Sequence, residues 1–329
     1  MSKKVLYAVQ ATGNGHLSRC MEFYPALSKH ADVDVLLSGI QGDLELPFPV
    51  KYKRHGLSFV FGKNGGIDYL RTALSLKPLR FIRDVWGIDL KPYDLVVNDF
   101  EPITAWACRF ARKDCVALSH QAAFLSKKTP RPSHKNWFAE FVFKHFAPAN
   151  RKVGLHFASY DDFIFTPIVR SEIRSLVTAY DPAEAVVYLP AYDHTVLIEQ
   201  LLPITKVRWS IFSKHATAIS TVGSITVYPI GRERWIDKLK LAQYAIVGGG
   251  FEGSSEMLFL KKKVMVLPMS DQYEQLCNAE ALRQMGVHIV RAIDENFTNR
   301  VRRWVDEATV IDVNFPRQSD EIIAEVLRV

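Results

Sequence analysis

The sequence predicts an α/β protein whose chain forms two doubly wound parallel sheets that face each other across a cleft. Short apolar runs of strand length alternate with helical patterns along most of the chain, which is typical of βαβ units. Glycine-rich loops follow two of these runs, near residues 11–15 and 248–250. The chain has 329 residues, 48% of them hydrophobic, which is enough to build a core in each of two domains.

The composition narrows the classes of partner. The formal net charge is +7, which suits a nucleoside diphosphate, an acidic membrane surface or a nucleic acid, and charge alone does not choose among them. No stretch approaches the ~20 apolar residues of a membrane span, and the run at residues 5–9 is too short for a signal peptide. The four cysteines lack the spacing of metal ligands. We therefore expect reduced, buried thiols and a soluble, cytoplasmic protein.

The first predicted unit is a strand at residues 5–9, a glycine loop at 11–16 and a helix at 17–30. The loop has a G-x-G pattern, but Ser18 stands where a dinucleotide fingerprint has its third glycine. The second strand, at 33–37, ends without the carboxylate that would bind a ribose. This loop therefore argues against NAD binding.

Polar side chains follow the next two predicted strands, at residues 93–97 and 116–118. The carboxyl ends of parallel strands face the ligand cleft of such a sheet, so these side chains are candidate site residues. They are Asn98, Asp99 and Glu101 after the first strand, and His120 after the second. Glu101 also suits a plain helix-start charge, and Asn98 competes with Asp99.

Two other segments of the first half are less regular. Residues 41–89 include a helical pattern at 68–86 that mixes apolar and basic side chains, and it suits an acceptor pocket or a solvated helix equally. Residues 127–152 combine basic with aromatic side chains and predict an amphipathic helix from about Ser133. That helix either packs on the core with a solvated basic side or contacts an acidic membrane through 131–152.

The second half repeats the alternation. After a strand at 153–158 and a linker near 170–182, further strands are predicted at 185–189, 206–212, 225–228 and 287–290. Helices are predicted at 194–202, 296–307 and 320–329. Lys214 and Ile230 follow two of the strands, so they too are expected at the carboxyl edge of the second sheet.

Residues 244–279 carry the strongest functional signal. An apolar strand at 244–247 runs into Gly248, Gly249 and Gly250, and helix, strand and helix patterns follow at 254–260, 264–267 and 273–285. Glycines let the backbone approach an anion, and the start of a helix favours negative charge, so the turn predicts a phosphate site. Carboxylates and amides in the two helices suit the hydroxyls of a ribose and a sugar. Together they indicate a nucleotide sugar.

This segment resembles the donor-binding region of inverting GT-B glycosyltransferases, the MurG and UDP-glycosyltransferase group. Their pattern is a small-residue turn, a Glu, a strand ended by proline, and then acidic-Gln-x-x-Asn-Ala. In this chain the matching residues are Gly249, Gly250, Glu256, Pro268, Glu274, Gln275, Asn278 and Ala279. The similarity is greatest to a little-characterised microbial branch with GGF…SE and EQ…NA motifs.

The resemblance implies two Rossmann-like domains: residues 1–165 for the acceptor and 166–316 for the donor. The segment 317–329 would form a helix that crosses back to the first domain. The donor would contact Lys214, Ile230, Gly249, Gly250, Phe251, Ser254, Glu256, Glu274, Gln275 and Asn278. The acceptor would lie near Gly13, Gly15, His16, Asp99 and His120.

The resemblance also implies roles for two of these residues. His16 would be the catalytic base that deprotonates the acceptor hydroxyl, and Asp99 would orient it. Retaining GT-B enzymes have a Glu eight residues before the position of Glu256, where this chain has Gly248, so inversion is expected. Gly248 and Gly253 also replace residues that often contact the donor. Helix dipole and basic side chains would stabilise the leaving diphosphate, so no metal and no other cofactor is expected.

The function expected from the sequence is a hexosyltransferase that moves a sugar, here expected from a UDP-sugar, to an unknown hydroxyl acceptor such as a lipid or glycan. Two alternatives remain. A UDP-sugar 2-epimerase shares the fold and the donor site. A non-catalytic nucleotide- or nucleic-acid-binding protein would suit the charge, although no nucleic-acid motif is present and no nucleic-acid partner is expected.

Overall fold

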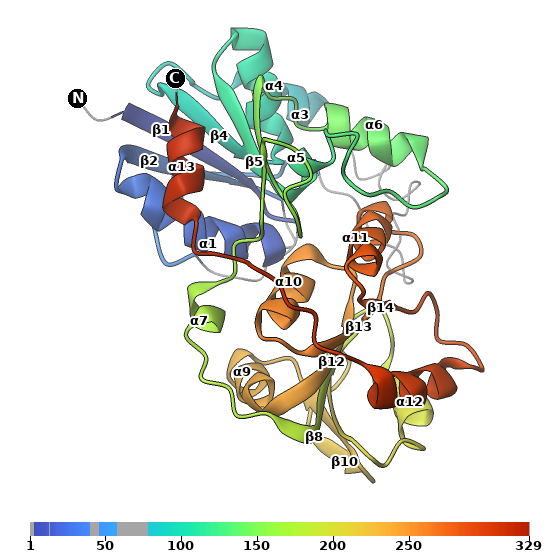
Figure 1. The fold of residues 1–329 in the computed structure, drawn as a ribbon. Helices are drawn as coiled ribbons and strands as arrows, with labels where there is room; N and C mark the ends of the chain where they lie inside the picture. The colour runs from blue at the N-terminus through green and yellow to red at the C-terminus, as the bar shows by residue number, and fades with distance from the viewer. Residues whose placement is uncertain (1–2, 13, 40–45, 58–77, 329) are drawn as a thin grey trace.

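The computed structural model describes residues 3–12, 14–39, 46–57 and 78–328. Within them the chain forms two sheets of seven strands each. Figure 1 shows the two sheets in two lobes, each flanked by helices, with α10 and α11 between them. This confirms the predicted α/β class with two parallel sheets. Among the described residues no helix has the length and apolar character needed to cross a bilayer.

The first sheet has the strand order β3-β2-β1-β4-β5-β6-β7, and all its neighbours pair in parallel. The order reverses at β1, so the loops after β1 and β4 open a crevice at the carboxyl edge. The strands are β1 (Lys3–Gln10), β2 (Ala31–Ser38), β3 (Tyr52–Arg54), β4 (Leu95–Asp99), β5 (Cys115–Ser119), β6 (Arg151–Leu155) and β7 (Ile164–Phe165).

The second sheet has the order β10-β11-β9-β8-β12-β13-β14. Its strands pair in parallel except β10, which is antiparallel at one edge. They are β8 (Asp181–Tyr188), β9 (Arg208–Ser213), β10 (Ser220–Val222), β11 (Ile225–Pro229), β12 (Ala242–Gly248), β13 (Lys263–Leu267) and β14 (His288–Ile289). The apolar runs explain these strands, since most side chains of β12 and β13 and those at residues 185–187 of β8 are buried.

Helices cover both sheets. Those before the second sheet are α1 (Asn14–Ser28), α3 (Pro78–Trp86), α4 (Pro102–Ala111), α5 (His120–Ala123), α6 (Trp137–His145) and α7 (Ser171–Arg174). The others are α8 (His194–Leu201), α9 (Arg232–Leu241), α10 (Phe251–Phe259), α11 (Tyr273–Gln284), α12 (Phe297–Glu307) and α13 (Ser319–Leu327). The four cysteines are free and buried, as the sequence predicted.

The last helix lies on the first domain. Figure 1 shows α13 beside α1, far from the second sheet. Its carbonyls at Glu325 and Leu327 accept hydrogen bonds from Arg151 and Lys3, at 2.9 and 3.2 Å. The C-terminal segment therefore ties the first domain to the chain that leaves the second.

Several sequence predictions differ from the structure in their bounds. The helix predicted at 254–260 begins at Phe251, because Gly250 already has extended backbone and acts as the N-cap. The helix predicted from about Ser133 begins at Trp137, where Asn136 caps it. The helical pattern at 68–86 lies outside the described residues up to 77, and α3 occupies the rest. No helix was predicted from the sequence at α9, because its residues are strongly polar.

Candidate active site

The crevice of the first sheet holds a buried acidic side chain at the end of β4. Asp99 is fully buried, and its Oδ1 lies 2.8 Å from Nδ1 of His16, near the start of α1. The residue after it, Phe100, has a φ of 55°, a left-handed conformation that is costly for a side chain of this size. The strand thus ends in a strained turn that leaves Asp99 at the edge facing the first glycine loop.

Arg19 completes this cluster, and the sequence analysis did not single it out. It lies one turn after His16 on α1, is 4% exposed, and donates from Nε and Nη2 to both oxygens of Asp99, at 3.0 and 2.9 Å. Burial alone would raise the pKa of Asp99, but the charges of Arg19 and His16 hold it below its usual value. Asp99 is therefore a stable carboxylate that accepts a hydrogen bond from the imidazole.

The competing residues at this strand end have structural roles. Asn98 donates to the carbonyl of Glu101 and to the hydroxyl of Thr104, at 2.7 and 2.8 Å. Glu101 is the N-cap of α4 and accepts from the amides of Ile103 and Thr104. Both side chains are thus used to start the helix, and Asp99 is the one that reaches His16.

His120, at the end of β5, lies where the two domains meet. Its Nδ1 is 2.8 Å from the carbonyl oxygen of Leu155, and its Nε2 is 2.9 Å from Oδ1 of Asn278 on α11. Its ring stacks on Phe251, with centroids 3.9 Å apart. Burial lowers the pKa of His120, against the opposing charge of Glu274. Because both ring nitrogens are occupied, His120 suits a general base less well than His16 does.

Two further contacts cross the cleft at the start of α11 and α10. Gln121 donates to Glu274, at 2.9 Å, while its own side-chain oxygen Oε1 is buried without a partner. Arg19 forms an ion pair with Glu252 in the first turn of α10. The structure therefore shows the cleft closed, with predicted donor residues bonded to groups of the first domain.

The second glycine turn is tightly braced by α11. A Cβ on Gly249 would lie 2.9 Å from the backbone oxygen of Gln275, whereas one on Gly250 would meet no atom within 4 Å. The side-chain oxygen of Gln275 accepts from the amides of Gly249 and Met269, at 3.2 and 3.0 Å. Asn278 donates to the carbonyl of Gly249, at 3.0 Å. Gln275 and Asn278 thus fix the turn, and Gly250 leaves its open side free.

Glu256, on α10, is buried rather than exposed to solvent. It is 5% exposed and forms a two-point ion pair with Arg170 of the interdomain linker, at 2.5 and 2.8 Å. Burial raises the pKa of Glu256, and Arg170 opposes that shift. The hydroxyl of Ser254 is also buried and donates to the carbonyl of Gly248 at 3.3 Å. Arg170 is a second residue that sequence reasoning missed.

Of the remaining predicted residues, Lys214 and Ile230 lie apart from this cluster. Lys214 and Ile230 are exposed and follow β9 and β11, at the same sheet edge as the glycine turn. Gly13 is outside the described residues. Gly15 is at the cluster, because a Cβ there would lie 2.7 Å from Oε2 of Glu252. Within the described part of the chain, no three His, Cys, Asp or Glu side chains gather in a way that could hold a metal ion.

Comparison with known families assigns the chain to one of them. The family model described as "Glycosyl transferase family 1" matches residues 3–307. The chain belongs to glycosyl transferase family 1. It is a glycosyltransferase with the GT-B fold that uses a nucleotide-sugar donor. No curated protein matches it by sequence.

Solved structures share the fold of this glycosyltransferase. Arabidopsis thaliana UGT89C1, complexed with UDP-L-rhamnose, is 13% identical, with a TM-score of 0.63 over 99% of this chain and 99% of that one. Acinetobacter baumannii MurG is 12% identical, with a TM-score of 0.58 over 98% of this chain and 94% of that one. SnogD from Streptomyces nogalater is 13% identical, with a TM-score of 0.55 and 99% of both chains covered.

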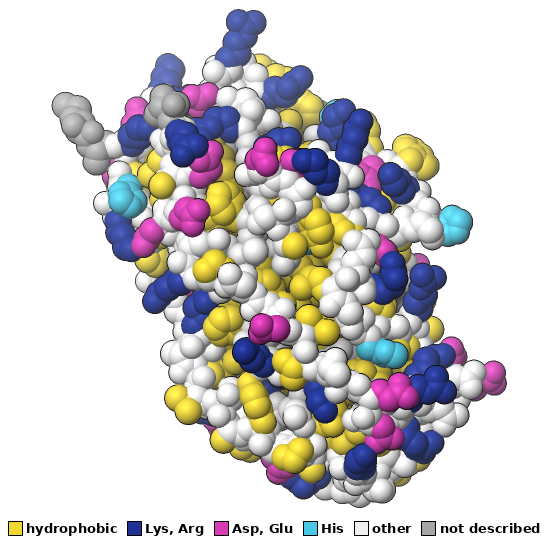
Figure 2. Space-filling view, viewed as in Figure 1, with side chains coloured by type: hydrophobic (Ala, Val, Ile, Leu, Met, Phe, Trp, Pro, Cys, Tyr) yellow, Lys and Arg dark blue, Asp and Glu magenta, His cyan; other side chains and the backbone are white. Residues whose placement is uncertain are grey.

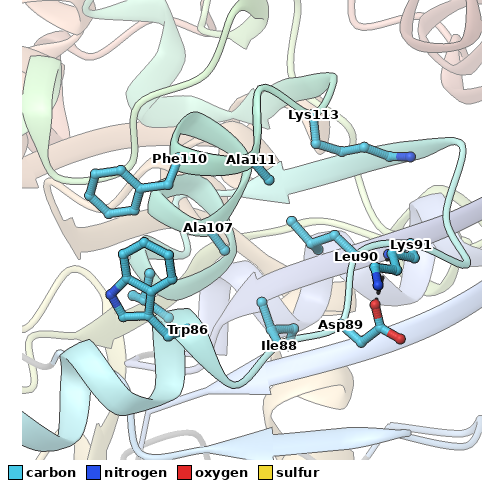
Figure 3. A pocket seen from close by; sticks show the side chains of 10 residues that line it. Trp86, Ile88, Asp89, Leu90, Lys91, Ala107, Phe110, Ala111 and Lys113 are labelled. Carbon is cyan, nitrogen blue, oxygen red and sulfur yellow. Dashed lines mark hydrogen bonds between the residues drawn. The ribbon is translucent and has the colours of Figure 1, made fainter.

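One cavity of this glycosyltransferase lies away from the cleft, between α3 and α4. It measures about 370 Å³ and is lined mainly by apolar side chains, with Lys91 and Lys113 at its edge (Figure 3). The rings of Trp86 and Phe110 stack beside it, with centroids 5.5 Å apart, although both side chains are more than half exposed. None of the residues predicted for the active site lines it.

Proposed function

We propose that this glycosyltransferase transfers a hexose from a UDP-sugar to a hydroxyl acceptor, with inversion and without a metal ion. Residues 1–165 would bind the acceptor and residues 166–316 the donor, with 317–329 crossing back to the first domain. The pair of His16 and Asp99, 2.8 Å apart and opposite the start of α10, is the observation that carries the proposal.

The proposed reaction uses the free nitrogen of His16. Asp99 accepts a hydrogen bond from the protonated Nδ1 of His16, so Nε2 keeps a lone pair that can accept the proton of the acceptor hydroxyl. As the acceptor oxygen bonds to the anomeric carbon, the bond from that carbon to the diphosphate oxygen breaks, and His16 takes the hydroxyl proton. Asp99, kept ionised beside it, stabilises the imidazolium that forms.

The donor would bind the second domain at the glycine turn. Backbone amides from Gly249 to Ser254 would face the diphosphate at the N-terminal end of α10, where anions are favoured. Glu256 would accept from the ribose hydroxyls, and its ion pair with Arg170 leaves further lone pairs on its oxygens for that role. Glu274 would bind the sugar with Gln275, and Asn278 would hold the turn.

The closed cleft sets a condition on this binding. Glu274 is hydrogen-bonded to Gln121, and Phe251 is stacked on His120. A sugar can therefore bind here only if these interdomain contacts break. We therefore propose that the domains move apart to admit the donor and close again around it. Closing would exclude water from the activated sugar.

A UDP-sugar 2-epimerase remains the alternative, because Glu252 and Glu274 lie with His120 at the cleft and such a reaction needs carboxylates and a histidine near the sugar. A transferase releases UDP only when an acceptor is present. An epimerase converts the UDP-sugar without one. Anion-exchange chromatography of the nucleotide products, with and without candidate acceptors, separates the two.

The experiment that tests the donor is a thermal-shift and calorimetric screen of UDP, GDP, dTDP and ADP with their sugars. Bound ligand raises the melting temperature by mass action. UDP is expected to bind wild-type protein, and Glu256→Ala is expected to weaken it at least about 10-fold through the lost ribose hydrogen bonds. If no nucleotide at millimolar concentration raised the melting temperature or gave a heat of binding, the proposal would be rejected.

We further propose that the first domain contacts an acidic membrane surface through residues 131–152. In α6, Phe143 is buried, while Trp137 and Phe141 are 78% and 56% exposed. Figure 2 shows basic side chains over the part of the surface where α6 lies. Exposed aromatic rings beside basic side chains suit the interface of an anionic bilayer.

Sedimentation with vesicles of anionic and neutral lipids tests this contact. Wild-type protein is expected to pellet with anionic vesicles, and the double variant Trp137→Ser with Phe141→Ser is expected to lose most of that binding. Equal binding by the variant would reject a contact through α6. Loss in a Trp86→Ser variant instead would move the contact to the surface between α3 and α4.

A further inference from the structure

Arg19 has more donors than its structural role requires. Nε and Nη2 of its guanidinium hold both oxygens of Asp99, while Nη1 is directed at Glu252 of the other domain. Burial alone would lower the pKa of Arg19, but the two carboxylates raise it, so the side chain stays charged although it is 4% exposed. One buried cation therefore lies between the proposed catalytic pair and the donor helix.

Glu252 occupies the place where the two glycine loops meet. It lies in the first turn of α10, two residues after the N-cap Gly250. Its carboxylate is also so close to Gly15 that a Cβ there would come within 2.7 Å of it. A diphosphate bound at the start of α10 would bring its own negative charge beside Glu252, and the two would repel each other.

We infer that Arg19 is a further catalytic residue, whose Nη1 face leaves Glu252 and binds the diphosphate of the donor while Nε and Nη2 stay on Asp99. The inference rests on the proposed function. A guanidinium has five N–H donors in a rigid fork, which suits simultaneous contact with a carboxylate and a phosphate. As the bond from the anomeric carbon breaks, its electron pair passes to the diphosphate oxygen, and Arg19 neutralises that charge.

This role makes Glu252 a competitor for Arg19. In the structure, the carboxylate keeps the buried cation paired and links the two domains. When the diphosphate replaces it, Glu252 has side-chain freedom to turn outward, because it is already 26% exposed. Removing the charge of Glu252 should therefore strengthen diphosphate binding, which a purely structural ion pair would not do.

The test measures binding of UDP and of uridine to the full-length chain, by calorimetry for UDP and ligand-observed NMR for uridine. Glu252→Gln is expected to bind UDP about 3- to 10-fold more tightly, since one like charge is gone. Arg19→Lys is expected to bind UDP at least about 10-fold more weakly, because the fork is lost. Uridine, which has no phosphate, should bind all variants alike. Arg109→Lys, on the exposed side of α4, is the matched control and should bind UDP as wild type does.

UDP affinities of both cleft variants within twofold of wild type would overturn the inference and leave the proposed function standing. Weaker UDP binding by Glu252→Gln would also overturn it, since Glu252 would then assist the donor rather than compete. Glu252→Gln alone decides the matter if Arg19→Lys does not fold. Wild-type protein that binds no nucleoside diphosphate would reject the proposed function itself, and the inference with it.

Discussion

Nδ1 of His16 lies 2.8 Å from Oδ1 of Asp99, although the two residues are 83 positions apart in the chain. β1 and β4 are neighbours in the first sheet, so the loop after one and the end of the other share an edge. Arg19 then holds both oxygens of Asp99 from one helical turn beyond His16. The imidazole is thus oriented by a buried carboxylate whose own position is fixed.

Removing the imidazole tests its role as the base. His16→Ala is expected to lower kcat about 10²- to 10⁴-fold, the usual contribution of general base catalysis. UDP affinity should stay close to that of wild type, because none of the proposed donor contacts is made by His16. Steady-state kinetics with a working acceptor, beside UDP calorimetry, measure the two quantities.

His30→Ala is the matched control for this experiment, since His30 is exposed just after α1. Its kcat should equal that of wild type. Normal turnover by His16→Ala would show that another group takes the proton. A loss of turnover only in His120→Ala would assign the base to His120 instead.

Asp99 should make stability depend on pH in the acid range. Its pKa is lower in the folded chain than the ~3.9 of an unfolded one, so it stabilises the fold above pH 4 and loses that contribution as the pH falls through its folded value. Asp99→Asn is expected to flatten this part of the pH profile. At pH 7 it should also cost about 3–5 kcal/mol, because it leaves the buried Arg19 with only the partly exposed Glu252 as a counter-charge.

Urea unfolding between pH 2.5 and pH 7 measures both effects. Asp94→Asn is a suitable control, because Asp94 is an exposed carboxylate just before β4, at the opposite end of the strand from Asp99. An acid slope of Asp99→Asn as steep as that of wild type would mean that other carboxylates cause the loss. Unchanged stability at pH 7 would contradict the buried ion pair.

The sequence predicted His16 and Asp99 as site residues, and the structure brings them into contact, but the residues around them were not predicted. His16 follows a glycine loop and Asp99 ends a buried strand, and both features are visible in a short window. Arg19 looks like an ordinary charged residue on a helix, because its burial depends on β4, 80 positions away. Glu252 was missed because the helix was predicted to begin at 254, whereas Gly250 caps it and places Glu252 in the first turn.

The same limit applies to the donor side. The spacing from Glu256 to Asn278 located the glycine turn and the helix that follows it. It did not reveal that Gln275 and Asn278 bond to Gly249, nor that Glu256 pairs with Arg170. Those contacts depend on how α11 and the linker pack, which a local pattern does not contain.

The two glycines of this turn should differ in their tolerance of a side chain. Gly249→Ala places a methyl group 2.9 Å from the backbone oxygen of Gln275 and 3.0 Å from Pro268, neither of which yields easily. It is expected to destabilise the fold by about 1–3 kcal/mol. Gly250→Ala, whose methyl group meets no atom within 4 Å, should stay within about 0.5 kcal/mol of wild type.

Equilibrium unfolding of the two variants in urea provides the comparison, and each is the control for the other. Equal stability would contradict the close packing of the turn against α11. UDP binding adds a second measurement: Gly250 lies on the open side of the turn, so its variant should lose donor affinity while it keeps its stability.

Lys262 should make stability depend on pH near neutrality, independently of the active site. It is fully buried after α10, donates to the carbonyls of Leu239 and Ala242, and lies over the ring of Tyr180. Burial lowers its pKa to about 7, far below the ~10.4 of an unfolded chain. Between these values the unfolded chain binds more protons than the folded one, so stability rises as the pH rises from about 7 to about 10.

The variant Lys262→Met fits the same space and removes the titrating group. Wild type is expected to gain roughly 1–3 kcal/mol more between pH 6.5 and pH 9.5 than the variant does. The variant should be less stable at pH 9.5, because the two carbonyls lose their donor. Urea unfolding at both pH values measures the two free energies of unfolding. If stability changed equally with pH in wild type and variant, Lys262 would not titrate in this range. The two carbonyls and the tyrosine ring would then keep it protonated in the folded chain, and the prediction would be wrong.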